Sequence, residues 1–204
     1  MSDIKNYLDC NVFFIDVYAG SMFNFSKLFR IREREISDPL LVAKSPPISW
    51  GTNISVYTDE KNPQKVFTVH QPLFRCATVK DVQETTIGFV IQKTGFLRSQ
   101  WNMLDRNHQE LGILSTASLK GWTDLLRWQF EIDHGTIPTT YSQDLNLSIK
   151  GKNIGSVSLV ERFPMRQIIV NLSFDNKMLM DRRMALAAAF LANSEISFRP
   201  NNGI

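Results

Sequence analysis

The sequence predicts a mainly β domain: a closed antiparallel β-barrel of about twelve strands around a buried hydrophobic C-terminal α-helix. Two observations predict it. Short runs that alternate apolar with polar residues fill most of the chain, and one Ala-rich apolar segment lies near the C-terminal end. Alternation is typical of strands with one buried and one solvated face. Turn residues separate the runs about every ten residues, as in a meander that forms a barrel or a sandwich.

The alternating runs are rich in Val, Ile, Phe, Thr and Trp, which favour strands. They lie at residues 11–18, 25–34, 38–44, 53–59, 65–71, 74–80, 86–93, 99–105, 110–116, 128–133, 144–150, 153–160 and 166–173. A weak internal repeat of strand, polar turn and strand recurs at residues 55–69, 101–114 and 145–160. The spacing between copies is irregular, so we expect successive hairpins and not a solenoid.

The segment 177–193 breaks this pattern, because it contains neither Gly nor Pro and is rich in helix formers. Asp175 or Asn176 is a candidate N-cap. The nine residues Met184 to Ala192 are all apolar, which indicates a helix buried on every side. Five of the nine are Ala, so the helix is thin enough to pass through a wide barrel lumen. The side chains expected to fill that lumen are Met184, Leu186, Ala187, Phe190 and Leu191.

Two further structures are considered. The apolar helix could instead pack between the two sheets of a sandwich. A second, short helix at 119–126 could close one end of a barrel. With 204 residues, we expect a single domain over 1–204 with its central helix at about 177–193.

Composition excludes several classes of protein. Lys and Arg number 23 against 20 Asp and Glu, a net charge of +3, so no nucleic-acid partner is expected. The longest apolar run has nine residues, whereas a membrane-spanning helix needs about 20, so no transmembrane segment is expected. The start of the sequence has no apolar signal-peptide core. We therefore expect a cytoplasmic protein that could lie peripherally at the inner face of a membrane, with Cys10 and Cys76 as reduced thiols.

No pattern of residues supports catalysis. His70, His108 and His134 form neither an HxxxH nor an HExxH pair, so no metal site is expected. Motifs for nucleotide binding or for a nucleophilic serine do not occur. The sequence predicts a protein that is not an enzyme, with no catalytic residues and no cofactor.

Three arginines give a candidate binding site. Arg30, Arg32 and Arg34 alternate along one predicted strand and would share one of its faces. Such a row could bind lipid phosphates, because guanidinium groups donate paired hydrogen bonds. A solvated strand face, or an edge strand charged against aggregation, is the simpler alternative. Lys150 and Lys152 at a hairpin tip are interpreted as ordinary exposed turn residues.

The sequence resembles the Tubby C-terminal-like superfamily, which includes Tubby proteins, phospholipid scramblases and LURP-one-related proteins. The resemblance is carried by Phe174, the sequence Asp181-Arg182-Arg183, the Ala-rich run, Phe190 to Asn193, and Phe198. Residues 86–93 are similar to the Ile-Gly-x-Val-x-Gln strand of scramblases, and 153–157 to their later Val-Gly-x-Ile strand. The resemblance implies the barrel with a central helix. We expect Arg182 and Arg183 to pair with acids such as Asp181 or Asp175.

The sequence also departs from that family. Scramblases have an acidic calcium-binding loop just before the helix, but the equivalent residues 165–171 contain no acid. Calcium control is therefore not expected. Asn193 stands where an acid is usual.

The resemblance and the arginine row together predict a non-catalytic module that binds anionic phospholipid head groups at a membrane surface. The alternative is a protein–protein interaction or scaffold domain without lipid affinity. A third hypothesis, a barrel that binds a small molecule or acts as an enzyme, requires a polar cavity inside the lumen.

Overall fold

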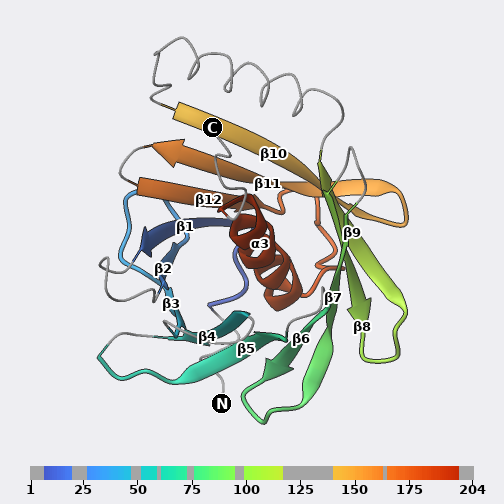
Figure 1. The fold of residues 1–204 in the computed structure, drawn as a ribbon, viewed down its shortest axis with the longest axis horizontal. Coiled ribbons are helices and arrows are strands. Elements are labelled where there is room, and N and C mark those ends of the chain that lie inside the picture. Colours follow the sequence, from blue (N-terminus) through green and yellow to red (C-terminus); the bar gives the residue numbers. More distant parts are fainter. Residues whose placement is uncertain are drawn as a thin grey trace, which may run out of the picture.

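The computed structural model describes residues 7–19, 27–46, 52–58, 61–72, 76–94, 99–116, 140–162 and 165–197. These residues form twelve strands and one helix, arranged as a barrel around a central rod (Figure 1). The strands are β1 Val12–Ala19, β2 Lys27–Arg32, β3 Leu41–Ser45, β4 Thr52–Tyr57, β5 Lys65–Gln71, β6 Cys76–Asp81, β7 Thr86–Thr94, β8 Ser99–Asp105, β9 Glu110–Thr116, β10 Thr140–Ile149, β11 Lys152–Arg162 and β12 Met165–Asn171. The helix is α3, Arg182–Ser197.

The barrel is a closed meander in which every strand pairs antiparallel with its neighbours in the sequence. Strand β1 closes the sheet against β12, in a register that runs from Val12 opposite Asn171 to Val17 opposite Arg166. Closure leaves none of the twelve described strands with an unpaired edge. The predicted fold class is therefore confirmed, and the sandwich alternative is wrong. The predicted strand at 128–133 and the predicted short helix at 119–126 lie outside the described residues.

The helix α3 fills the lumen. Every residue from Met184 to Ala192 is at most 3% exposed, and this stretch includes Leu186, Ala187, Phe190 and Leu191. The Phe190 ring packs on Phe29 of β2, with 5.0 Å between the ring centroids. A twelve-stranded barrel is too wide for its own side chains to fill, and the Ala-rich helix supplies the missing core.

The helix begins at Arg182, five residues later than predicted. The Asp175 carboxylate does accept backbone N–H groups, from Leu179 at 2.8 Å and Met180 at 3.0 Å. These bonds form a tight turn in which Met178 has a positive φ of 48°, a conformation that a right-handed helix excludes. The N-cap is Asp181, whose Oδ1 accepts the Arg183 N–H at 2.9 Å.

Four of the hairpins each contain a bulge of the same type. The register shifts by one residue between Val56 and Tyr57, Val79 and Lys80, Met103 and Leu104, and Leu147 and Ser148. Each time the extra residue on the second strand is aliphatic: Val66, Ile87, Leu111 and Ile154. The next residue is Phe67 in the first hairpin and Gly in the other three. This bulge is the structural basis of the internal repeat in the sequence.

The bulge glycines allow close packing. A Cβ atom on Gly88 would lie 2.2 Å from the Leu104 carbonyl oxygen, and one on Gly155 would lie 2.1 Å from that of Asn171. Met184 of α3 packs against Gly88, at 3.0 Å from that Cβ position. The Gly-containing strands noted in the sequence are therefore positions where the backbone of the next strand, or the central helix, approaches most closely.

Candidate functional site

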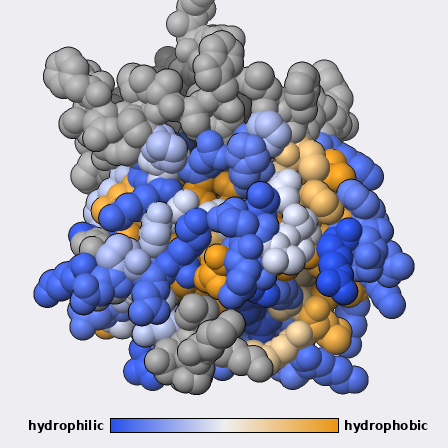
Figure 2. Space-filling view, turned by 90° about the horizontal axis from the view of Figure 1, so that it is seen from below, coloured by the Kyte–Doolittle hydropathy of each residue, from blue (hydrophilic) through white to orange (hydrophobic). Residues whose placement is uncertain are grey.

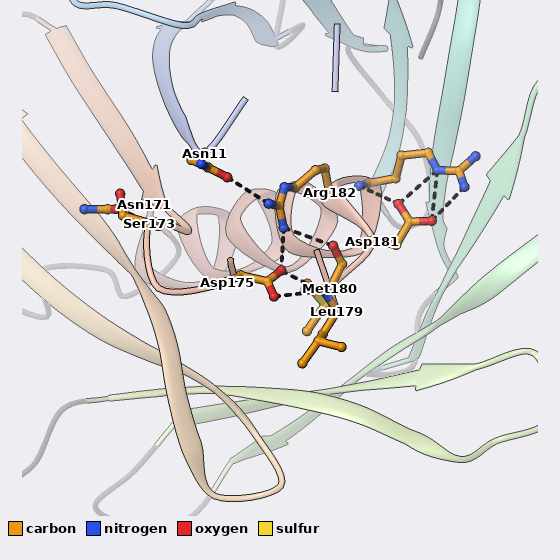
Figure 3. Close-up of polar contacts among 9 residues, drawn as sticks. Asn11, Asn171, Ser173, Asp175, Leu179, Met180, Asp181 and Arg182 are labelled. Carbon is orange, nitrogen blue, oxygen red and sulfur yellow. Dashed lines mark hydrogen bonds and ion pairs between the residues drawn. The ribbon is translucent and has the colours of Figure 1, made fainter. Parts of the chain in front are cut away.

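A buried polar cluster holds the helix at the end of the barrel where it enters. Arg182 Nη1 donates to Asp175 Oδ2 at 2.6 Å, and the two side chains are 4% and 0% exposed. Arg182 Nη2 donates to Asn11 Oδ1 at 2.9 Å. Figure 3 shows Arg182 at the start of α3, between Asn11 and Asp175. The cluster thus joins the residue just before β1, the helix and the segment that precedes the helix.

The Asp175 carboxylate is ionised in this environment. Burial alone would raise its pKa, but hydrogen bonds from Met180 N–H, Arg182 and Leu179 N–H outweigh burial and lower the pKa from its ordinary value. Arg182 also donates to the Met180 carbonyl oxygen at 3.1 Å. Both partners are therefore charged, paired and surrounded by further hydrogen bonds.

A second ion pair lies beside the first, closer to solvent. Arg183 Nη2 donates to Asp181 Oδ2 at 2.7 Å, with side chains 29% and 30% exposed. The expectation that the two arginines pair with Asp181 and Asp175 is confirmed. Both pairs stabilise the entry of the helix and leave little positive charge free at its start.

The segment Leu172–Asp181, which we call the capping segment, connects β12 to α3 at this end of the barrel. Asn171 Oδ1 accepts the Ser173 N–H at 2.9 Å where the chain leaves β12. The segment then passes on the side of the helix that faces β8 and β9 (Figure 1). At its far end Met180 Cε and Ile149 Cγ1 both pack against Gly112, at 2.7 and 3.4 Å from its Cβ position. The capping segment therefore lies next to the β10–β11 hairpin.

The capping segment exposes large apolar side chains. Phe174 is 69% exposed, Leu179 60% and Met178 53%, whereas Asp175 and Met180 point inward and are buried. Ile36, in the β2–β3 loop at the same end of the barrel, is 96% exposed. In the described part of the chain, these four are the large hydrophobic residues that are exposed to solvent. Sequence analysis did not predict their exposure. Met178 and Leu179 fell in the segment 177–193, which was assigned to the buried helix, whereas Phe174 and Ile36 lie between predicted elements.

Exposed cations surround the capping segment. Lys177 lies within it, Lys150 and Lys152 flank the tip of the β10–β11 hairpin, and Arg106 lies in the β8–β9 turn. None of the four has an ion-pair partner among the described residues. Two carboxylates, Asp105 and Glu110, lie nearby, and the Asp105 Oδ1 atom already accepts two turn N–H groups. We call this side of the end the basic sector.

The opposite side is acidic. The β2–β3 loop carries Glu33, Glu35 and Asp38 around a single Arg34. Asp9 lies on the same side, since Glu33 and Asp9 are both close enough to Cys10 to interact electrostatically with its thiol. Burial raises the Cys10 pKa, and these two acids raise it further. Strands β2 and β3 lie across the barrel from β8 and β9 (Figure 1). We call this side the acidic sector.

The predicted arginine row is not continuous. Arg30 and Arg32 share the outer face of β2, which ends at Arg32, so Arg34 lies in the acidic sector beyond the strand. Arg32 forms an ion pair with Asp16 of β1 and donates to the Glu35 carbonyl oxygen. The Arg30 guanidinium lies over the Tyr18 ring, 5.2 Å from its centroid. The strand therefore brings two of the three arginines together, and both have partners.

One side of the barrel is mainly hydrophilic, with hydrophobic residues in small separate groups (Figure 2). Among the described residues, no group of three or more His, Cys, Asp or Glu side chains is placed to hold a metal ion. Within the same residues, no helix combines the length and the apolarity that crossing a membrane would need.

Comparison of the sequence with known proteins identifies no family. No protein-family model matches the chain, and no curated protein matches it.

Proposed function

We propose that this chain is a non-catalytic, scramblase-like or Tubby-like module that binds anionic phospholipid head groups at a membrane surface. One observation carries the proposal: Phe174, Met178 and Leu179 are exposed beside Lys150, Lys152 and Lys177. Apolar side chains that insert at the head-group boundary, together with lysines near anionic lipids, are the two contributions that hold peripheral proteins on membranes.

The packed interior of the barrel favours ligand recognition by its outer surface and loops. Side chains of α3 occupy the lumen along the whole stretch from Met184 to Ala192. A ligand would have to displace this packed core, at a large cost in free energy. The hypothesis of a small-molecule or enzymatic barrel is therefore disfavoured, and recognition through loops is favoured.

The test is flotation of the protein with phosphatidylcholine vesicles, with and without phosphatidylserine or a phosphoinositide. We expect binding that requires the anionic lipid and weakens as salt is raised, because the head-group attraction is screened. Failure to bind anionic vesicles at low ionic strength would contradict the proposal.

The alternative function is a protein-interaction or scaffold domain. The same exposed apolar residues favour it, since a protein partner could also cover them. A partner held mainly by apolar contact would stay bound at high salt. Recovery of one stable, salt-insensitive partner, together with no binding to vesicles, would favour this alternative.

A further inference from the structure

The two sectors at the helix-entry end of the barrel differ in charge but both expose apolar side chains. The basic sector contains Arg106, Lys150, Lys152 and Lys177 against two carboxylates, and the acidic sector contains four carboxylates around Arg34. An anionic membrane attracts the first and repels the second. Hydrophobicity alone would let the exposed apolar residues of either sector insert into a membrane. The charge of the two sectors therefore decides which of them faces an anionic bilayer.

We infer that the barrel docks in a tilted orientation, with the capping segment and the β10–β11 hairpin tip against the anionic bilayer and the β2–β3 loop turned away from it. In this orientation Phe174 and Leu179 enter the head-group boundary, and Lys150, Lys152 and Lys177 approach lipid phosphates. Ile36 stays in water, although it is the most exposed of the apolar residues. This inference rests on the proposed function and specifies the surface that performs it.

The geometry of the capping segment suits insertion. Asp175 accepts hydrogen bonds from Leu179 N–H, Met180 N–H and Arg182, so the turn that carries Met178 and Leu179 is anchored to the buried cluster. A loop fixed in this way loses little conformational entropy on binding. The neighbouring hairpin tip is also fixed: Lys150 and Gly151 have positive φ angles of 50° and 76°, as a tight two-residue turn requires.

The test compares matched variants by their partition onto phosphatidylcholine–phosphatidylserine vesicles. Phe174→Ser combined with Leu179→Ser should reduce the partition coefficient by about ten-fold or more, because both apolar anchors are lost. Ile36→Ser, the apolar control from the acidic sector, should leave it unchanged. Both sets change exposed residues only, so circular dichroism should show the native fold.

A second pair of variants tests charge. Lys150→Gln with Lys152→Gln should lower the partition coefficient by about five-fold for each lysine, since a basic residue near an anionic surface contributes about 1 kcal/mol. Lys44→Gln with Lys93→Gln removes the same charge from exposed positions on β3 and β7 and should have a much smaller effect.

The outcomes separate this inference from the proposed function. If the unmodified protein binds anionic vesicles, but Ile36→Ser weakens binding as much as the Phe174 and Leu179 substitutions, the tilted orientation is wrong and membrane binding stands. Equal losses from the two lysine pairs would overturn the orientation as well. If the unmodified protein does not bind at all, both the function and the orientation are overturned.

Discussion

At the scale of single residues, the buried ion pair of Asp175 and Arg182 determines how the chain enters the lumen. A charge taken out of water costs several kcal/mol unless it is paired and hydrogen-bonded. Asp175 meets that condition with two backbone N–H groups and a guanidinium, and Arg182 with a carboxylate, a carbonyl and an amide oxygen. Of the side-chain nitrogen and oxygen atoms of this pair, Arg182 Nε alone has no hydrogen-bond partner among the described residues. The pair therefore fixes how the chain turns from β12 into the lumen.

Removing one member of this pair should be costly. Arg182→Met leaves the Asp175 carboxylate buried without its counter-charge, and we expect the free energy of unfolding to fall by about 3–5 kcal/mol. The control is Arg183→Met, which breaks the neighbouring exposed pair and should cost about 1 kcal/mol or less. Urea unfolding of both variants measures the difference. Equal losses would show that burial of the Asp175 pair has no special importance.

The same pair predicts a dependence on acid. Because the folded-state pKa of Asp175 is lowered, its contribution to stability is present above the ordinary carboxyl value of 3.8 and is lost as pH falls through the lower folded value. Asp175→Asn cannot titrate. We therefore expect the stability difference between the unmodified protein and Asp175→Asn to be constant above about pH 5 and to shrink as pH falls below 3.8. A difference that grew on acidification would contradict the assignment.

At the scale of elements, the repeated bulge explains why Gly follows an aliphatic residue in three hairpins. The extra residue turns the second strand, and at each glycine that follows it a Cβ atom would meet a backbone oxygen of the adjacent strand. Gly88, Gly112 and Gly155 fill these positions. In the first hairpin Phe67 takes the same place and is fully buried. The bulge in the first hairpin therefore accommodates a buried aromatic side chain at this position.

Gly155→Ala tests this account. Its Cβ atom would lie 2.1 Å from the Asn171 backbone oxygen, where β12 ends. Relief of that clash requires strand movement, so we expect a loss of about 1–3 kcal/mol. The control is Gly151→Asn at the hairpin tip, where no atom lies within 4 Å and φ is +76°. Asn tolerates this conformation, and its cost should stay below about 1 kcal/mol. A neutral Gly155→Ala, measured by thermal unfolding, would overturn the argument.

The sequence predicts elements better than it predicts their ends. Alternation locates the strands because each has one buried face, and nine consecutive apolar residues indicate a helix with no solvated face. The first turn of that helix was placed too early, since Lys177 to Asp181 have ordinary helix propensity. The tight turn there depends on Asp175 meeting Arg182, which only the folded chain brings about.

The candidate surface was harder to predict for the same reason. Lys150 is far in the sequence from Phe174 and Lys177 and becomes their neighbour only because the capping segment crosses to β9 and β10. The row of Arg30, Arg32 and Arg34 was suggested by spacing alone. Spacing could not show that β2 ends at Arg32 or that Arg32 forms an ion pair with Asp16 of β1. Whether the row contributes to lipid binding stays a prediction.

At the scale of the whole molecule, barrel and helix form one core. Inward-facing residues such as Ile15, Ile31, Val69, Val90 and Leu147 belong to the same buried cluster as Phe190 and Leu191. The helix follows all twelve described strands in the sequence, so the wall cannot complete its core until α3 has entered the lumen. We therefore expect a single cooperative unfolding transition that includes both.

Truncation after Asp181 tests whether the barrel and α3 fold as one unit. Without α3 the lumen-facing side chains would meet water or collapse, because the wall of a twelve-stranded barrel cannot fill its own interior. We expect the shortened chain to lack a cooperative thermal transition and native near-ultraviolet circular dichroism. Phe190→Ala in the full chain is the control. It removes one ring from the Phe29 contact and should keep the fold while costing about 3–5 kcal/mol. A truncated chain that unfolded cooperatively near the native temperature would show that the wall is stable alone, and that α3 is an insert and not the core.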